Sequence, residues 1–430
     1  MGVQEQLEQL RALVHAGASS WGWTQICVVL NEMEDEAAQV GLDYARQHVE
    51  AWPLTFRDAA IGHATDLNPP PVWWPLVGAV TLSCYELRET DARALAHNPG
   101  LRHVRHLKLI GVEAALLPVL MASPHWFVTH LTLHMHGVDT LDRALASAPR
   151  RDQLTELTLS VDSLRSEGAR TLAAWPELRR LTCLNLNHSY FDLDGLRAIM
   201  ESPFLKQLHT LRLGHIEAFG VDGLRLLGGN VQEMEQLTHI DLARWGLGSA
   251  GMAHLANQPW LAQLTGLELG RNDFTTQDVH TLLHSPHLKA LHTLELGGNG
   301  LDSNVADVLA NADALRPLKR LGLMYSNLGD EGVGALLETT CLSHLERLDL
   351  EGNALGDEGA KTLATSPYLA RLTDLDLRMN QIGFLGAEAL AQSPTLGQLH
   401  TLNLWNNPIG RRGRWLLRRL PHIGRLTLVV

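Results

Sequence analysis

A short pattern of apolar and polar positions recurs along most of the chain. Segments such as 264–272, 345–353 and 372–380 place leucine at positions 1, 4 and 6 and asparagine at position 9. The alternation predicts a short strand with one buried face. The first leucines from Leu264 to Leu399 are 27 residues apart every time. Related copies extend back to Val77 and forward to a partial copy at Ile423, which gives 14 copies.

The second half of each copy predicts a helix. Within 356–372 the apolar residues Ala360, Leu363 and Ala364 recur at helical spacing. Asp330 and Asp357 follow a glycine at the place where an N-cap is expected. A proline that cannot continue the helix follows in most copies, namely Pro99, Pro124, Pro149, Pro176, Pro203, Pro259, Pro286, Pro367 and Pro394. Each copy is therefore predicted to form one strand and one helix.

Stacked copies of this kind predict an α/β solenoid. Strands stack at about 4.8 Å and helices need about 10 Å, so a parallel sheet should line the concave face and helices the convex face. The leucines form one continuous core, and position 9 should bind the backbone of the turn. Asn272, Asn299, Asn353, Asn380 and Asn407 supply that position, with Ser326 as a further candidate. Earlier copies hold Val112, His136, Asp162, Ser189, Ile216 and Trp245 there, which predicts a less regular N-terminal half.

The 27-residue copies with helix starts such as Gly-Asp-Glu-Gly-Ala resemble leucine-rich repeats of the ribonuclease-inhibitor type, in arrays like those of bacterial proteins. The resemblance covers about four-fifths of the chain and implies a horseshoe-shaped solenoid. Ribonuclease inhibitor itself is rich in cysteine and alternates its repeat lengths. This chain has four cysteines and a constant spacing over its later copies, so ribonuclease inhibition is not implied.

The pattern divides the chain into a segment 1–72 without repeats and a repeat domain 73–430. The first segment predicts helices at Gln4–Val14, Thr24–Asn31, Asp35–Glu50 and Thr55–Ile61. Because an exposed first repeat needs a cap, this segment is interpreted as the N-terminal cap of the solenoid. An adaptor-recruiting module resembling an F-box is the alternative, although the segment lacks a matching Leu-Pro start.

Composition narrows the class of function. Lys plus Arg number 35 and Asp plus Glu 47, so the net charge is −12, which argues against a general nucleic-acid binder. No apolar run is long enough to span a membrane, and no secretory signal is apparent. The four cysteines lie far apart, which favours a reducing compartment. We therefore expect a cytoplasmic monomer that binds neither membrane nor nucleic acid.

The candidate binding residues lie between and just after the core leucines. Side chains alternate along a strand, so positions 3 and 5 should point into the hollow of the solenoid. Position 5 carries a row of acids, and positions 7 and 8 carry arginine and large aromatic residues, which are frequent interface anchors. A protein partner with a basic surface is expected to contact Arg212, Asp241, Arg244, Glu268, Arg271, Glu295, Tyr325, Arg347, Asp349, Asp376, Arg378 and Trp405.

The predicted function is that of a non-enzymatic protein–protein interaction scaffold without a cofactor. No phosphate-binding loop and no His-Glu-x-x-His motif is present. One alternative is a regulator of a small GTPase, since Ran GTPase-activating proteins share this repeat type. Another is a bacterial effector or adaptor that uses the repeats to recognise a target. An effector with ubiquitin-ligase activity would need a catalytic domain with a reactive cysteine, and Cys341 lies in a helix–strand link.

Two further clusters of residues each have a functional interpretation and a purely structural one. Position 3 of consecutive copies holds His106, His130, Glu156 and Cys183, which could converge on zinc or be a chance column in a histidine-rich chain. We nevertheless predict no metal-binding residue. The C-terminal segment has no acid after residue 410 and could bind phosphate or an acidic partner, or form a capping helix with a solvated face. Its arginines are Arg411, Arg412, Arg414, Arg418, Arg419 and Arg425.

Overall fold

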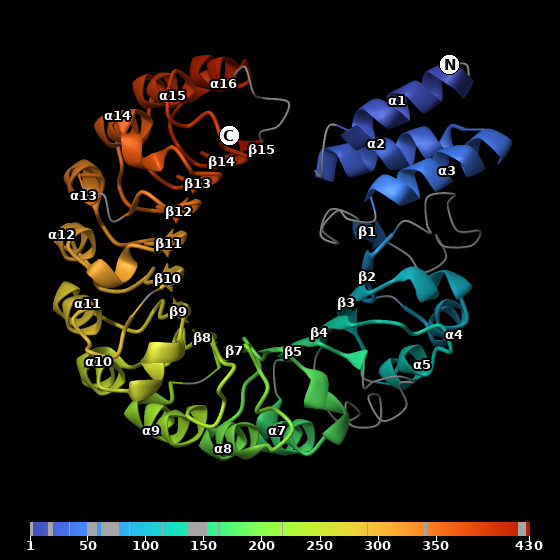
Figure 1. The fold of residues 1–430 in the computed structure, drawn as a ribbon, viewed down its shortest axis with the longest axis horizontal. Coiled ribbons are helices and arrows are strands. Elements are labelled where there is room, and N and C mark those ends of the chain that lie inside the picture. The colour runs from blue at the N-terminus through green and yellow to red at the C-terminus, as the bar shows by residue number, and fades with distance from the viewer. Residues whose placement is uncertain are drawn as a thin grey trace. The chain divides into compact units, whose positions relative to one another are not determined.

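The computed structural model describes residues 3–15, 20–33, 35–49, 58–61, 77–85, 87–113, 115–135, 153–161, 164–216, 218–289, 291–338, 342–419 and 427–430. All structural statements concern these residues. The chain divides into two compact units, residues 1–207 and 208–430, and each is described by itself (Figure 1). The boundary predicted at residue 72 stays a prediction.

The first unit opens with three helices, α1 (Val3–His15), α2 (Ser20–Asn31) and α3 (Asp35–Val49). They match the first three helices predicted from the sequence. Leu10, Ile26 and Leu30 are fully buried among them. The three helices therefore pack around a small apolar core of their own.

The fourth predicted helix is wrong in its described part. Asp58–Ile61 forms strand β1, which pairs in parallel with the following strand, Asp58 opposite Ala79 and Ile61 opposite Leu82. Local propensity favoured a helix, but the edge of a parallel sheet offers a row of backbone hydrogen-bond partners. The sheet thus begins one strand before the first copy that the sequence pattern reveals.

The rest of the first unit alternates strands with helices. Each strand pairs in parallel with the next in chain order. The strands are β2 (Ala79–Ser83), β3 (His106–Val112), β4 (His130–Met135), β5 (Glu156–Val161) and β6 (Cys183–Asn185). The helices are α4 (Glu89–Ala96), α5 (Leu117–Met121), α7 (Arg165–Ala173) and α8 (Leu193–Glu201).

The second unit repeats one strand and one helix with greater regularity. Its strands lie on the inner side and its helices on the outer side (Figure 1). The strands are β7 (Thr210–Arg212), β8 (His239–Asp241), β9 (Gly266–Glu268), β10 (Thr293–Glu295), β11 (Arg320–Gly322), β12 (Arg347–Asp349), β13 (Asp374–Asp376), β14 (Thr401–Asn403) and β15 (Thr427–Val429). The helices are α9 (Gly220–Val231), α10 (Gly248–Ala256), α11 (Thr276–Leu283), α12 (Val305–Ala310), α13 (Gly329–Leu336), α14 (Asp357–Thr365), α15 (Phe384–Ala391) and α16 (Gly410–Leu417).

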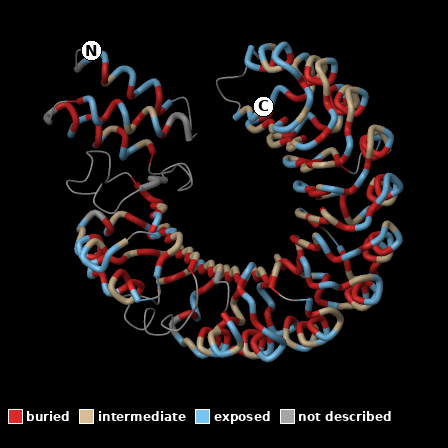
Figure 2. The backbone as a smooth tube through the Cα atoms, turned by 180° about the vertical axis from the view of Figure 1, so that it is seen from behind, coloured by how far each residue is buried: buried red, intermediate tan, exposed pale blue. Residues whose placement is uncertain are grey.

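The core of the second unit lies between these two layers. Leu264, Leu267 and Leu269, at positions 1, 4 and 6 of one copy, are at most 2% exposed. The same positions are buried in the neighbouring copies, and the buried backbone runs as a continuous band inside the unit (Figure 2). The leucine pattern therefore defines the core as predicted.

The predicted asparagine ladder is confirmed. Asn353 is fully buried, and its amide oxygen accepts hydrogen bonds from the backbone N–H groups of Ser326 and Leu328. Its amide nitrogen donates to the carbonyl oxygens of Leu323 and Glu351. Asn272, Asn299, Asn380 and Asn407 make equivalent bonds to the turn of the preceding copy. Each asparagine thus satisfies backbone groups that would otherwise be buried without a partner.

Other residues at position 9 replace only part of this function. The indole nitrogen of Trp245 donates to the carbonyl of Leu213 at 2.7 Å, and the hydroxyl of Ser189 donates to the carbonyl of Leu159. Ser326 is buried, but its hydroxyl has no partner among the described residues, so the expectation that it joins the ladder is wrong. Serine at this position therefore bonds in one copy and not in the other.

Strand length differs along the chain. Strands β2 to β5 have five to seven residues, whereas β6 to β14 have three. Strand β3 continues as far as Val112, at position 9 of its copy. The lower regularity expected for the N-terminal half is therefore present. Asparagine at position 9 is not required for a short strand, because β6, β7, β8 and β11 also have three residues without it.

Trp245 offers a test of the ladder. Replacing Trp245 by phenylalanine should lower the free energy of unfolding by about 2 kcal/mol, because the Leu213 carbonyl loses its donor and the smaller ring leaves a void. Urea unfolding of the full chain measures the change. The control is Trp405→Phe, since Trp405 is 53% exposed. Equal effects from both substitutions would contradict this role of Trp245.

The two aspartates predicted as N-caps cap a different helix from the one expected. Asp357 is itself the first residue of α14, and Asp330 lies in the first turn of α13. The carboxylate of Asp330 accepts from Gly356 N at 2.7 Å, and that of Asp357 accepts from Gly383 N and Gly386 N at 2.7 Å. Each therefore binds the N-terminus of the helix in the next copy, where a negative charge is favourable.

Candidate functional site

The inner face of the second unit carries a groove of about 320 Å³ across strands β10 to β15. Side chains at position 3 form one row of its lining, with Arg320, Arg347 and Asp374 on successive strands. Position 5 forms a second row that includes the carboxyl groups of Glu295, Asp349 and Asp376. The groove therefore carries charged side chains of both signs in two rows, above a lining that also includes Leu321, Leu348 and Leu375.

Most of the position-5 side chains have a local structural role. The side-chain oxygen accepts a hydrogen bond from the backbone N–H two residues later, from Ala243 to Asp241 and from Glu351 to Asp349. Arg378 N donates to Asp376 in the same way. Asn185 and Asn403 make the identical bond without a charge. In these copies an Asp or an Asn oxygen makes the same bond, so the turn does not need the negative charge.

Two acids in the groove hold their protons unusually strongly. Burial raises the pKa of Glu295 to about 8, and the charges of Glu268 and Asp349 act in the same direction. Burial also raises the pKa of Asp349 to about 6, although the hydrogen bond from Glu351 N opposes the shift. The Glu295 carboxyl extends over Gly322, where an added Cβ would collide with it. The glycine thus lets one acid lie close to the next, and Glu295 is mainly protonated at neutral pH.

Glu268 is neutralised within the protein. Its carboxylate lies 3.2 Å from the Arg212 guanidinium and 2.7 Å from His239 Nε2. Burial alone would raise the pKa of Glu268, but the hydrogen bond with His239 and the Arg212 charge hold it below the ordinary value. Arg212, His239 and Glu268 lie on β7 to β9 and are not among the residues that line the groove.

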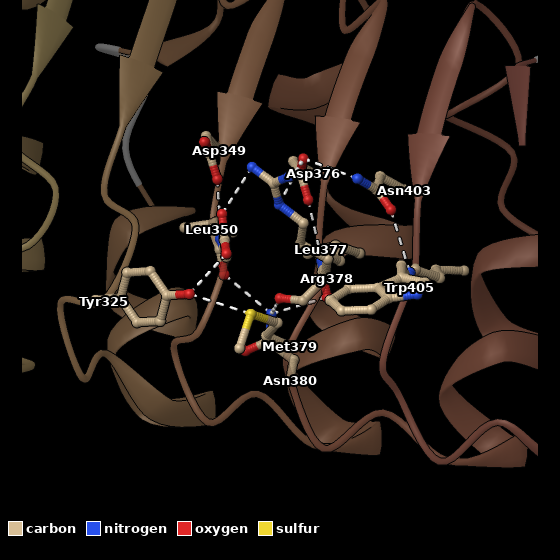
Figure 3. A network of polar contacts seen from close by, with 12 residues as sticks. Tyr325, Asp349, Leu350, Asp376, Leu377, Arg378, Met379, Asn380, Asn403 and Trp405 are labelled. Carbon is tan, nitrogen blue, oxygen red and sulfur yellow. Dashed lines mark hydrogen bonds and ion pairs between the residues drawn. The ribbon is translucent and has the colours of Figure 1, made fainter. Parts of the chain in front are cut away.

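A polar network connects the groove to the turns that follow the strands (Figure 3). Arg378 lies 2.7 Å from Glu351 and 3.3 Å from Asp376. The Tyr325 hydroxyl donates to Glu351 at 2.7 Å and lies 3.1 Å from the Met379 sulfur. Glu351 is buried and holds both the arginine and the tyrosine in place. These contacts fix the side chains at the edge of the groove.

We define the rim as Arg244, Arg271, Tyr325, Arg378, Met379 and Trp405, which occupy positions 7 and 8 after the strands. Trp405 is 53% exposed, and Tyr325 and Met379 are each 39% exposed. The position-8 members Arg244, Arg271, Tyr325 and Met379 all have a positive φ, between 53° and 61°. Glycine adopts this conformation readily, but other residues pay about 1 kcal/mol or more. The rim therefore keeps large side chains where glycine would fit with less strain.

Glycine occupies the same position in the intervening copies. Arg271 lies over Gly298 and Tyr325 lies over Gly352, because an added Cβ at either glycine would collide with that side chain. Both glycines also have a positive φ. At position 8, large side chains and glycines therefore alternate from Arg271 to Met379. The long side chains thus lie flat along the rim.

The twelve residues predicted to bind a partner separate into three groups. Glu295, Arg347, Asp349 and Asp376 line the groove, where Arg347 also pairs with Asp374 at 3.3 Å. Arg244, Arg271, Tyr325, Arg378 and Trp405 belong to the rim. Arg212, Asp241 and Glu268 are engaged in internal contacts on β7 to β9, and Asp241 is only 2% exposed.

Sequence reasoning missed Glu351 and Met379 as parts of this site. Glu351 and Arg378 both occupy position 7 and are 27 residues apart. That spacing places them side by side on adjacent copies, so the repeat register could have revealed the pair. The burial of Glu351 has no comparable signal in the sequence.

The histidine column of the first unit does not form a metal centre. Among the described residues, no group of three or more His, Cys, Asp or Glu is arranged to hold a metal ion. The His106 and His130 rings lie with their centroids 3.7 Å apart and their planes tilted by 33°. His130 Nε2 lies 3.1 Å from Glu156 instead. Cys183 is opposite Glu156 on β6.

Comparison with known proteins bears on the fold. Residues 314–337, 341–364 and 371–391 match the family model described as Leucine Rich repeat. The fold is an α/β leucine-rich-repeat solenoid. No curated protein matches the sequence. Within the described parts of the chain, no helix is long and apolar enough to cross a membrane.

Solved structures of similar fold have low sequence identity to this solenoid. A chain in the crystal structure of the yeast Rad7 and Elc1 complex has a TM-score of 0.50 at 15% identity, over 95% of this chain and 92% of that chain. The internalin inlF of Listeria monocytogenes has a TM-score of 0.31 at 18% identity, over 78% and 73%. A chain of the mouse RP105/MD-1 complex has a TM-score of 0.38 at 17% identity, over 77% and 56%.

Proposed function

We propose that residues 208–430 form a non-enzymatic protein-binding module, and that its groove and rim receive a partner with a basic surface. The ribonuclease-inhibitor type, the cytoplasmic location and the monomeric state stay predictions from the sequence. No described residue favours the GTPase-regulator or effector alternative over this one.

The observation that carries the proposal is the strained rim. Side chains such as Arg271, Tyr325 and Met379 occupy left-handed positions, although Gly298 and Gly352 demonstrate that this repeat accepts glycine there. Backbone strain without a structural benefit is typical of functional sites. Tyr, Trp and Arg are also the residues that most often dominate binding energy. Contact with a partner is a reason to keep them.

The surplus charge of the groove supports a basic partner. The turn does not need a negative charge at position 5, as Asn403 demonstrates, so the charges of Asp349 and Asp376 are additional. Adjacent like charges on a sheet are unfavourable. A lysine or arginine of a partner would neutralise these charges and displace the proton that Glu295 holds. Among structures of similar fold, the yeast one is of a complex of two proteins, Rad7 and Elc1.

Glycine substitutions in the rim test the proposal. The variant Tyr325→Gly with Met379→Gly should lose at least tenfold in affinity for a partner, because two anchors are removed. Its fold should be retained, since glycine relieves the positive φ at both positions. Affinity capture from native extract, read by mass spectrometry, measures the loss.

The matched control is Arg225→Ala, which changes an exposed residue on the outer helix α9. The control should capture the same partners as the unmodified chain. If the folded glycine variant also captures them in equal amounts, the rim is not the binding surface and the proposal fails.

A further inference from the structure

Helix α16 reverses the charge pattern found at the start of α13 and α14. Helices α13 and α14 begin with Gly-Asp-Glu-Gly at residues 329–332 and 356–359. At the same repeat positions, residues 410–413 read Gly-Arg-Arg-Gly, with Arg411 and Arg412 in place of the two acids. Cations in the first turn oppose the helix dipole, whereas acids complement it. The substitution therefore costs stability at this helix.

Among the described residues, no ion pair compensates for these charges. Of the described arginines after residue 410, none lies within 4 Å of a carboxylate in the described structure, and no acid occurs in 410–430. Exposed arginines on other helices behave differently, since Arg93, Arg197 and Arg225 each pair with an acid on their own helix. The surface of α16 and its following turn thus presents unneutralised Arg411, Arg412, Arg414, Arg418 and Arg419.

An aromatic residue lies within this surface. Trp415 is 55% exposed, and the Arg419 guanidinium lies over its ring at 4.0 Å. Arg412 lies 4.6 Å over the ring of Phe384 on α15. These contacts hold two guanidinium groups in place while leaving their N–H groups at the surface. Arginine beside exposed tryptophan is the composition of an interface hot spot.

We propose that this surface of α16 docks an acidic segment of a protein partner. Arginine binds carboxylates through two parallel hydrogen bonds, and the basic residues after Lys361 are arginine and histidine without lysine. The surface therefore binds aspartate and glutamate side chains, with Trp415 covering an apolar neighbour. It lies on the outer helices and is separate from the groove.

The structure around α16 disfavours an anionic membrane or a nucleic acid as the partner of this surface. The apolar side of α16 is turned inward, since Ile409, Gly413 and Leu417 are buried, so Trp415 on α16 and Leu385 on α15 are the large exposed apolar residues of these two helices, too few to hold a bilayer. An extended nucleic-acid backbone would meet the acidic first turns of α13 and α14. A short acidic segment needs only the surface of one repeat.

The double variant Arg411→Asp with Arg412→Glu tests the proposal, because it gives α16 the helix start of α13 and α14. The probe is a fluorescent peptide of alternating aspartate and glutamate around one tryptophan. The unmodified chain should bind it, more weakly at high salt, and the variant should bind at least tenfold more weakly. The thermal midpoint of the variant should be equal or higher, since the acids favour the helix.

Three comparisons make the result decisive. Arg197→Glu with Arg225→Glu carries the same change in charge on other helices and should leave peptide binding intact. The rim variant Tyr325→Gly with Met379→Gly should also bind the peptide normally, so failure of the groove proposal leaves this one standing. Unchanged peptide binding by the Arg411 and Arg412 variant would overturn the proposal. So would absent binding by the unmodified chain, or tighter binding of an oligonucleotide or a phosphatidylserine vesicle.

Discussion

Replacing Glu295 by glutamine is expected to flatten the decrease in stability that the chain undergoes between pH 5 and pH 8. The ordinary pKa of this group is 4.5, and in the folded chain it is about 8. Between these values the folded chain holds a proton that the unfolded chain has released, so rising pH favours unfolding by about 1.4 kcal/mol per pH unit. The stabilising effect of the proton is complete at low pH and is lost as the pH rises through 8.

The variant should therefore be about 4 kcal/mol more stable than the unmodified chain at pH 8.5, because the decrease extends over about three pH units, and within about 1 kcal/mol of it at pH 5. Urea unfolding at a series of pH values measures the stability of both chains. The control is Glu338→Gln, which changes an exposed acid and should leave the pH dependence unaltered. Parallel pH profiles for the unmodified chain and Glu295→Gln would contradict the crowding of acids over Gly322.

Replacing Asn353 by alanine is expected to lower the free energy of unfolding by about 3 kcal/mol. The side chain accepts two backbone hydrogen bonds and donates two at a fully buried site. Each buried backbone group left without a partner costs about 1 to 3 kcal/mol, and relaxation of the turn recovers part of the sum. The adjacent Ser326 hydroxyl has no partner among the described residues, so this turn has little to replace the lost bonds.

Urea unfolding at neutral pH measures the change, with Asn304→Ala as the matched control because Asn304 is exposed. A change of less than 1 kcal/mol would mean that water satisfies the turn and would contradict the stabilising role of the asparagine ladder.

The repeat made much of the fold predictable. Leucine at positions 1, 4 and 6 defined strands and core, and asparagine at position 9 defined the turns, because both act within one copy and its neighbour. Strand β1 was not predictable, since Asp58–Ile61 has no leucine pattern and becomes a strand only by pairing with β2. The role of Asp330 was missed because its partner, Gly356 N, lies 26 residues away in the next copy.

The candidate site was predictable only in part. The sequence placed Glu295, Asp349 and Tyr325 on one face; Glu295 and Asp349 line the groove, and Tyr325 belongs to the rim. It could not distinguish Asp241, which is buried against its own turn, from Asp376, which lines the groove, because both make the same local hydrogen bond. The positive φ of the rim residues has no signal in residue type, since Arg, Tyr and Met rarely adopt it.

The groove and the α16 surface have opposite charge and lie on opposite layers of the same unit. The groove is proposed to take a basic surface and α16 an acidic segment, so a single module could hold two partners at once. The two proposals have separate variants and separate controls. Each can therefore fail without the other.

Photo-crosslinking from the rim tests the central claim most directly. Benzoylphenylalanine is placed singly at Tyr325, at Trp405, and at the exposed Gln277 on the outer helix α11, and each chain is irradiated in native extract. The account predicts that the same protein is crosslinked from positions 325 and 405 and not from position 277. Crosslinking of that protein equally from position 277, or from position 277 alone, would contradict binding at the inner face.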